Sequence, residues 1–314
     1  MGSRWGRLAV LTVVLGVLAL IGGTEPAGAV TPGPDDRRIG VDISWPQCGQ
    51  ELPGAMPFAV IGVNGGTAAT TNACLVDQLS WARETTTGAN PRQPRIQLYV
   101  NTANPGEVLE EYGVITWPTG NIDMRGQDSL ANPDEQSRNP YGRCTITPGS
   151  YRGFTNDLAC SWQYGWNRAV EAVDQRFGPA AREAGVSAAA SDYTWWLDVE
   201  TMNSWQDGGA DAYARNAASL EGMTQFYTAE GVATVGLYST GYQWRLIVGD
   251  TLGVPTADPP AVGANLVGLV SWLAGSLDAT DAQIRCTTAI GLTGGPVVMN
   301  QYIAGDLDYN YSCV

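Results

Sequence analysis

The acidic side chains are the residues of this chain best suited to chemistry. The sequence has 314 residues, with 31 Asp and Glu against 17 basic residues, all of them arginine, and it contains no His and no Lys. The missing types exclude histidine-based nucleophiles, imidazole metal clusters, Schiff bases and Walker-type phosphate loops. Acid–base chemistry near neutral pH therefore falls to carboxylates, with Tyr or Cys as distant second choices.

The most informative acidic pair lies in the run Trp195-Trp196-Leu197-Asp198-Val199-Glu200. Side chains alternate along a strand, so Asp198 and Glu200 share one face with Trp196, and their Cα atoms lie about 6.6 Å apart. Polar and glycine residues follow, which places the pair at the carboxyl end of the strand, where α/β barrels hold their active sites. Two carboxylates this close cannot both ionise freely, so one of them is expected to have a raised pKa. That group could donate a proton at about pH 6.

Two further acids are predicted to join this pair. Asp42 lies on the polar face of a strand predicted over 39–44, and Asp308 follows the last predicted strand. The first and last strands of a closed barrel are neighbours, so Asp42 and Asp308 are expected beside Asp198 and Glu200. The alternative is structural, because aspartates at strand ends commonly make turns or cap helices.

Amide and aromatic side chains at or near strand ends suit sugar recognition, in which rings stack on aromatics and hydroxyls bond to amides. The alternative is that the aromatics fill the core. The predicted substrate-binding residues are Trp196, Asn64, Asn101, Tyr238, Trp272, Gln301 and Tyr302.

Apolar periodicity predicts strands alternating with helices, a pattern typical of a largely parallel α/β domain. Seven or eight such units favour one irregular TIM-like (β/α) barrel over 39–314. The strands are predicted at 39–44, 58–63, 96–100, 194–200, 234–238, 266–273 and 296–303, and the helices at 72–84, 158–184, 210–230, 242–248 and 278–289. Residues 104–156 show no sustained period and are predicted to be a long insertion between the third and fourth strands, with Tyr112, Trp117 and Tyr141 available for a cleft wall. The alternative is a passive surface loop.

The first 29 residues have the order of a secretory signal peptide. Arg4 and Arg7 precede an apolar run over 8–21, and Ala27-Gly28-Ala29 supplies a small-residue cleavage site. The run is short for a membrane span, although an uncleaved anchor is the alternative. Cleavage removes two arginines and Glu25 from a chain of net charge −14, which leaves −15. Residues 30–38 then form a short leader.

All six cysteines follow the signal peptide, and an even number in an exported chain indicates three disulfides. Fifteen pairings are possible, and proximity along the chain favours Cys48–Cys74, Cys144–Cys160 and Cys286–Cys313.

Three short motifs resemble those of glycoside hydrolase family 25, the lysozyme-like muramidases. They are Gly40-Val41-Asp42-Ile43-Ser44, Leu197-Asp198-Val199-Glu200, and Gln301-Tyr302 followed by Leu307-Asp308-Tyr309-Asn310. The insertion, the disulfides and Val63-Asn64-Gly65-Gly66 after the second strand are not typical of the family, so the chain resembles a divergent member. The resemblance implies cleavage of the β-1,4 bond after N-acetylmuramic acid in peptidoglycan. It assigns the general acid to Glu200, an assisting role to Asp198, and supporting roles to Asp42 and Asp308.

The sequence thus predicts a secreted glycoside hydrolase that acts on cell-wall glycan or another polysaccharide, without a metal or other cofactor. The negative net charge argues against nucleic acid as a partner, and no membrane association is expected after signal cleavage. A non-catalytic wall- or carbohydrate-binding protein that keeps the barrel is the alternative. The oligomeric state is left open.

Overall fold

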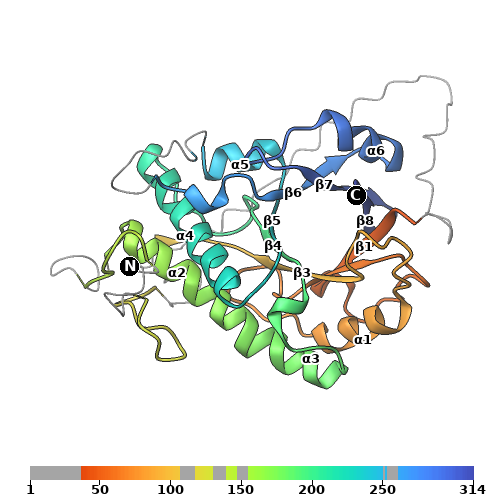
Figure 1. Cartoon of the computed structure of the whole chain (residues 1–314), viewed down its shortest axis with the longest axis horizontal. Helices are drawn as coiled ribbons and strands as arrows, with labels where there is room; N and C mark the ends of the chain where they lie inside the picture. Colours follow the sequence, from red (N-terminus) through yellow and green to blue (C-terminus); the bar gives the residue numbers. More distant parts are fainter. Residues whose placement is uncertain (1–36, 107–116, 130–138, 147–154, 250–251, 253–260) are drawn as a thin grey trace, which may run out of the picture.

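Eight strands form a closed barrel in the computed structural model, which describes residues 37–106, 117–129, 139–146, 155–249, 252 and 261–314 (Figure 1). The predicted signal peptide (1–29) and residues 30–36 of the predicted leader lie outside these ranges. The strands are β1 (Ile39–Ile43), β2 (Ala59–Gly62), β3 (Ile96–Asn101), β4 (Trp195–Asp198), β5 (Val235–Ser239), β6 (Val270–Ser276), β7 (Val297–Ala304) and β8 (Leu307–Ser312).

The strand directions make this a mixed α/β barrel. Neighbouring strands from β1 to β7 are parallel, whereas β8 is antiparallel to both β7 and β1. The prediction of a closed barrel is confirmed, but the TIM-like (β/α) arrangement is not supported. The turn Gly305–Asp306 between β7 and β8 has only two residues, which can reverse a strand but cannot carry a parallel crossover. The β1–β2 connection likewise holds only the 3-10 turn η1 (Trp45–Gln47).

Helices cover the outside of the barrel after β2 to β6 (Figure 1). The predicted helical stretch 158–184 is built from α2, a π-helical turn over Ala172–Phe177, and α3. The helices are α1 (Leu75–Thr85), α2 (Leu158–Glu171), α3 (Gly178–Ala184), α4 (Ala210–Ala229), α5 (Gly241–Ile247) and α6 (Ala279–Thr288).

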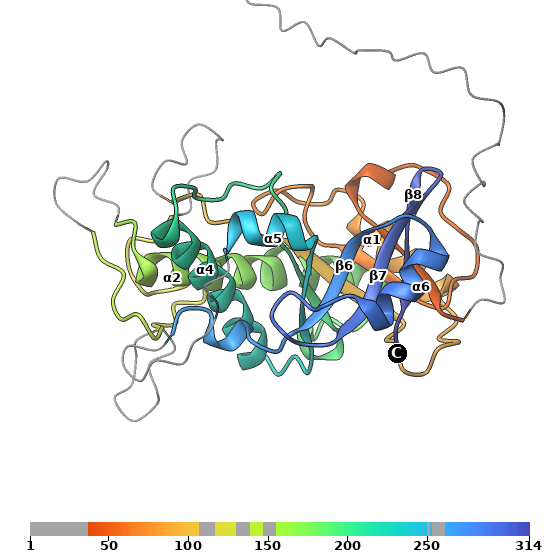
Figure 2. The same cartoon turned by 90° about the horizontal axis from the view of Figure 1, so that it is seen from above.

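Helices α2 and α4 lie side by side on the end of the molecule away from β8 (Figure 2). Two glycines allow this approach. A Cβ atom on Gly165 would lie 1.8 Å from the carbonyl oxygen of Ser219, and one on Gly222 would lie 2.0 Å from that of Trp162. Neither position therefore tolerates a side chain without moving a helix.

Apolar side chains fill two layers, because alternate residues of each strand face opposite sides. The outer layer packs the barrel against its helices and includes Val41, Leu197 and Leu237. The interior is filled by a smaller cluster that includes Phe58, Trp196 and Met299. The inner face also carries the polar residues that reach the carboxyl ends of the parallel strands.

The predicted disulfide pairing is confirmed. Cys48 pairs with Cys74, Cys144 with Cys160 and Cys286 with Cys313.

The described part of the predicted insertion 104–156 packs against α2 and α4. Trp117 stacks on Tyr164 of α2 at 5.3 Å between ring centroids, and the Tyr141 hydroxyl donates a hydrogen bond to Glu221 of α4. Burial raises the pKa of Glu221, whereas that hydrogen bond lowers it. Neither Trp117 nor Tyr141 is among the residues that line the acidic cleft, and Tyr112 lies outside the described residues.

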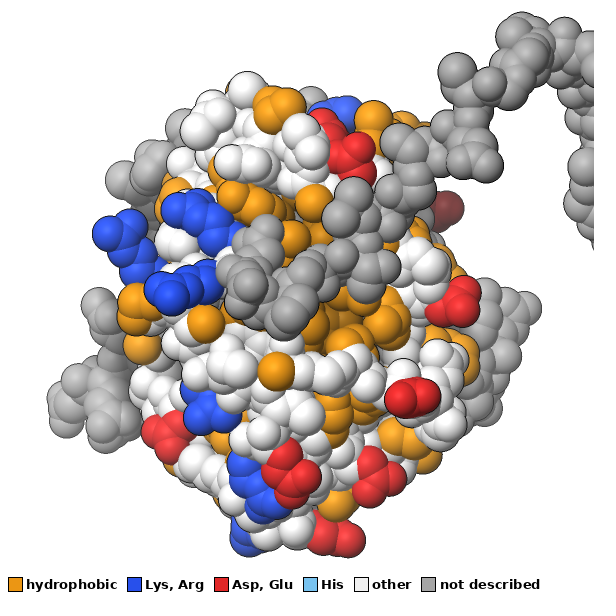
Figure 3. Space-filling model, turned by 90° about the vertical axis from the view of Figure 1, so that its right-hand side faces the viewer, with side chains coloured by type: hydrophobic (Ala, Val, Ile, Leu, Met, Phe, Trp, Pro, Cys, Tyr) orange, Lys and Arg blue, Asp and Glu red, His pale blue; other side chains and the backbone are white. Residues whose placement is uncertain are grey.

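On the side of the molecule that lies at the right of Figure 1, arginines and carboxylates are scattered in small groups among apolar and neutral side chains (Figure 3). The excess of acids is thus not gathered on this face. In the described part of the chain, no helix has the length and hydropathy needed to cross a membrane.

Candidate active site

One cleft brings together all four predicted catalytic carboxylates. It lies at the carboxyl ends of the parallel strands, has a volume of about 240 Å³, and is lined by side chains from both ends of the chain. Its lining residues are Asp42, Ser44, Trp45, Pro46, Gln47, Gly66, Tyr99, Asn101, Asp198, Glu200, Met202, Asn203, Tyr238, Trp272, Gln301 and Asp308. In the part of the chain that is described, no group of three or more acids or cysteines is arranged to hold a metal ion.

Asp42 is buried at the base of the cleft. Asn310 Nδ2 donates to its Oδ2 at 2.7 Å, and Gln301 Nε2 lies 3.2 and 3.1 Å from its two oxygens. Asp308 is its direct partner in the antiparallel β1–β8 register, so the two carboxylates share one face. Burial and then the charge of Asp308 raise the pKa of Asp42 well above its usual range, although the amide hydrogen bonds lower it.

Asp198 ends β4 and is 3% exposed, so its environment is nearly dry. Asn101, its partner on β3, donates from Nδ2 to Asp198 Oδ2 at 2.5 Å, whereas Asp198 Oδ1 has no hydrogen-bond partner among the described residues. Burial first, and then the charges of Glu200 and Asp42, raise the pKa of Asp198. This site therefore favours a protonated carboxyl.

Glu200 lies just beyond β4, which ends two residues earlier than predicted. Its side chain reaches the same cleft as Asp198 and is held by one long hydrogen bond of 3.4 Å from Gln243 Nε2. Burial raises the pKa of Glu200, the Gln243 hydrogen bond lowers it, and the charge of Asp308 raises it. Burial also raises the pKa of Asp308. Glu200 is thus a partly exposed acid with a raised pKa in a cleft, which is the environment of a proton donor.

Four of the predicted substrate-binding residues, Asn101, Tyr238, Trp272 and Gln301, also line the cleft. The Tyr238 hydroxyl donates to Gln301 Oε1 at 2.7 Å, and Gln301 in turn donates to Asp42. Tyr238 and Trp272 lie 4.3 Å apart between ring centroids. These side chains therefore connect an aromatic surface to the carboxylates.

The other three predicted substrate-binding residues do not reach the cleft. Tyr302 follows Gln301 on β7, and adjacent strand residues face opposite sides, so Tyr302 packs in the outer layer against Tyr309. Trp196 does face the interior, but it lies one inward-facing position below Asp198, is 1% exposed, and donates from Nε1 to Gln97. Asn64 is also buried, and its Oδ1 accepts the backbone N–H of Asn101.

One wall of the cleft, which lies outside the barrel strands, was not predicted. It comes from the β1–β2 connection, where the indole of Trp45 is 50% exposed and lies over Gly66. Gln78 Nε2 donates to the carbonyl oxygen of Ser44 at 2.6 Å, and the Cys48–Cys74 disulfide joins this connection to the start of α1. In the sequence, Trp45-Pro46 follows a polar strand end directly, and this pair could have predicted an aromatic side chain beside the cleft. Tyr99 also lines the cleft and was not predicted, although it faces the same side of β3 as Asn101.

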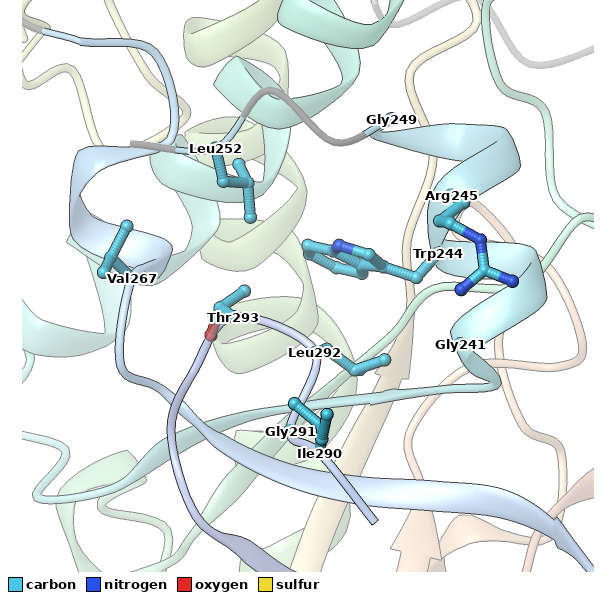
Figure 4. A pocket seen from close by; sticks show the side chains of 10 residues that line it. All are labelled: Gly241, Trp244, Arg245, Gly249, Leu252, Val267, Ile290, Gly291, Leu292 and Thr293. Carbon is cyan, nitrogen blue, oxygen red and sulfur yellow. The ribbon is translucent and has the colours of Figure 1, made fainter. Parts of the chain in front are cut away.

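A larger hollow of about 440 Å³ lies between α5 and the segment between α6 and β7 (Figure 4). Trp244 projects into it, with Leu252, Val267 and Leu292 around the ring. Its described lining includes no carboxylate. Because the chemistry of this chain depends on carboxylates, the smaller acidic cleft is the candidate active site.

Comparisons with known proteins give only distant structural likenesses. No family model matches the chain, and no curated protein matches its sequence. A bacterial lysozyme from Streptomyces coelicolor superposes with a TM-score of 0.41 at 13% identity, covering 88% of this chain and 91% of the other. A muramidase from Trichobolus zukalii gives a TM-score of 0.39 at 13% identity, covering 88% and 93%. Likenesses at this level establish neither a family nor an activity for this chain.

Proposed function

We propose that this chain is a secreted glycoside hydrolase that cleaves β-1,4 bonds in the glycan of peptidoglycan. The observation that carries the proposal is the convergence of Asp42, Asp198, Glu200 and Asp308 on one cleft beside aromatic and amide side chains. Glycoside hydrolysis needs a proton donor and a second carboxylate or an equivalent neighbouring group. The three motifs that resemble family 25 supply these four acids, which supports a divergent relative of that family.

Glu200 is the proposed proton donor. Its carboxyl is the more accessible member of the Asp198–Glu200 pair, and burial keeps its pKa raised. Asp198 lines the same cleft, and no arginine is among its described lining residues, so neither carboxyl group has a cationic partner there. Besides burial, the charge of Asp308 raises the pKa of Glu200 and so favours its protonated form, and an ionised carboxylate in the cleft stabilises the positive charge that develops on the sugar.

The cleft surface suits a sugar chain. Trp45, Tyr99 and Trp272 offer rings for stacking, while Asn101 and Gln301 offer amides for hydroxyl groups. The three disulfides favour an oxidising compartment, which agrees with the predicted signal peptide and secretion.

The deciding experiment is hydrolysis of purified peptidoglycan by the chain and by Glu200→Gln. Loss of the proton donor should lower kcat by roughly a hundredfold to ten-thousandfold. The matched control is Glu183→Gln, an exposed position on α3 that should leave kcat unchanged. New reducing ends measured in the soluble fraction report the reaction.

One result would contradict this function, and another would contradict the role of Glu200. If glycan is captured equally by the chain and by Glu200→Gln, and neither releases product at any pH, the chain is a wall-binding protein. If Glu200→Gln hydrolyses glycan at the parent rate, the proton donor is another residue.

A further inference from the structure

A second hollow adjoins the acidic cleft. It has a volume of about 430 Å³ and is formed by the segment 67–70, the residues after β3, Tyr164 of α2 and the segment 202–204. Met202 and Asn203 line both the hollow and the cleft, so the two spaces meet at these side chains. A chain bound in the cleft can therefore place a branch in the hollow.

Asn203 is an unpartnered polar group at this junction. It is 8% exposed, its Oδ1 is buried, and this atom has no hydrogen-bond partner among the residues that the structure describes. Its backbone N–H donates to the carbonyl oxygen of Glu200 at 3.1 Å, which fixes it close to the proposed proton donor. A buried acceptor without a partner is costly, so a small rotation of the Asn203 amide that lets a ligand in the hollow donate a hydrogen bond to this oxygen gains affinity.

The hollow differs from the cleft in charge. Four carboxylates line the cleft, but none is among the described residues that line the hollow. Behind its wall, Arg176 donates from Nη2 to the carbonyl oxygen of Ala69 at 3.0 Å, and the Arg168 guanidinium lies 5.5 Å from the centroid of the Tyr164 ring. Ala69 and Tyr164 both line the hollow.

These two arginines are buried and share one acid, Glu171. Counted over the residues that the structure describes, the group holds one excess positive charge in a dry environment, where screening by solvent is weak. That charge attracts a carboxylate placed in the hollow, whereas any ionised acid of the adjoining cleft repels it.

We propose that the hollow binds the peptide branch of the glycan, while the acidic cleft holds the sugar backbone. This proposal rests on the proposed function. A peptide joined through a lactyl ether brings amide N–H donors for Asn203 Oδ1, apolar side chains for Ala68, Ala103 and Pro105, and carboxylates for the field of the buried arginines. The chain would then prefer glycan that carries its peptides.

The test is binding by isothermal titration to Glu200→Gln, which should hold glycan without cleaving it. The two probes are an oligosaccharide of alternating N-acetylglucosamine and N-acetylmuramic acid with its peptides attached, and the same oligosaccharide with the peptides removed. We expect the peptide-bearing probe to bind about tenfold more tightly.

Two substitutions in the Glu200→Gln chain locate the effect. Ala69→Trp fills the hollow and should reduce the affinity for the peptide-bearing probe to that for the stripped probe. Asn203→Leu removes the amide and should reduce the same preference. Ala189→Trp, an exposed position that precedes β4 at the opposite end of the barrel, is the matched control and should retain the preference.

Equal affinity for the two probes overturns this inference alone, provided that the parent chain hydrolyses glycan. An undiminished preference in Ala69→Trp also overturns it, because the branch then binds elsewhere. If neither probe binds and the parent chain cleaves neither, both this inference and the proposed function fail.

Discussion

Asp42 on β1 lies directly opposite Asp308 on β8, and both carboxylates face the cleft. Like charges directly opposed across an antiparallel pair are destabilising when both are ionised. The arrangement is held by the hairpin that returns β8 to β1 and by the amides of Gln301 and Asn310 around Asp42. Stability is thus given up at the position where the proposed activity needs acids.

Asp308→Asn should stabilise the protein at neutral pH. The pKa values of Asp42 and Asp308 are raised in the folded state. At pH values just above the usual carboxyl pKa, the folded state therefore binds more protons than the unfolded chain. Their contribution to the free energy of unfolding therefore falls as the pH rises. Removing one charge should add about 0.5–1 kcal/mol at pH 7, and the gain should shrink towards about pH 4. Urea unfolding at several pH values measures it.

The matched control is Asp306→Asn, which removes an exposed charge in the β7–β8 turn. An equal gain in this control, or a gain for Asp308→Asn that does not depend on pH, would show that the two cleft acids are not coupled.

Gln243→Leu should move the alkaline limb of the pH–kcat profile to higher pH. The hydrogen bond from Gln243 Nε2 to Glu200 Oε1 lowers the pKa of Glu200, and its removal leaves the burial that raises it. A proton donor acts only while it is protonated, so a higher pKa extends activity upwards in pH. Thr201→Ala is the control, because Thr201 Oγ1 contacts Gln243 Oε1 and leaves the bond to Glu200 intact. A limb that stays in place would exclude Glu200 as the group that titrates.

Two disulfides close loops of nearly equal length, so a comparison of their variants distinguishes an effect on stability from an effect on function. Cys48–Cys74 spans 26 residues and Cys286–Cys313 spans 27, so loop entropy predicts a similar cost of about 3.5 kcal/mol for replacing either pair with serine. Only the first pair secures the cleft wall that carries Trp45. At a temperature where both variants are folded, kcat/KM on glycan should fall for the Cys48/Cys74 variant alone. An unchanged kcat/KM in the Cys48/Cys74 variant would mean that this wall makes no contribution to substrate binding, and an equal fall in both variants would mean that the effect is not specific to the wall.

Gly165→Ala should destabilise the contact between α2 and α4. A Cβ atom there would lie 1.8 Å from the Ser219 carbonyl oxygen, which belongs to rigid helix backbone, and overpacking of this kind costs about 3 kcal/mol. Gly120→Ala is the control, because a Cβ atom at Gly120 meets nothing within 4 Å. Thermal unfolding followed by circular dichroism compares the two. Equal midpoints would show that the helices can separate at little cost.

Much of the fold follows from local patterns. Apolar periodicity placed β1 and β4 within two residues, and α4 within one, because these elements bury regular apolar faces. The disulfides followed from proximity along the chain. The strand β8 was missed, since its inward positions, Asp308 and Asn310, are polar. Its signals were the two-residue turn Gly305–Asp306 and the outward alternation of Leu307, Tyr309 and Tyr311.

The residue types and their alternation along the strands define the chemistry available to this protein and the strand faces that carry it. Without His or Lys, the carboxylates were the remaining acid–base groups, and alternation placed Asp198 and Glu200 on one face. Tertiary structure alone decided what surrounds them. The antiparallel direction of β8 sets Asp308 against Asp42, depth in the barrel buries Trp196, and the β1–β2 connection adds Trp45. These outcomes depend on contacts between distant segments, which set burial and distance and are not encoded in the period of any one segment.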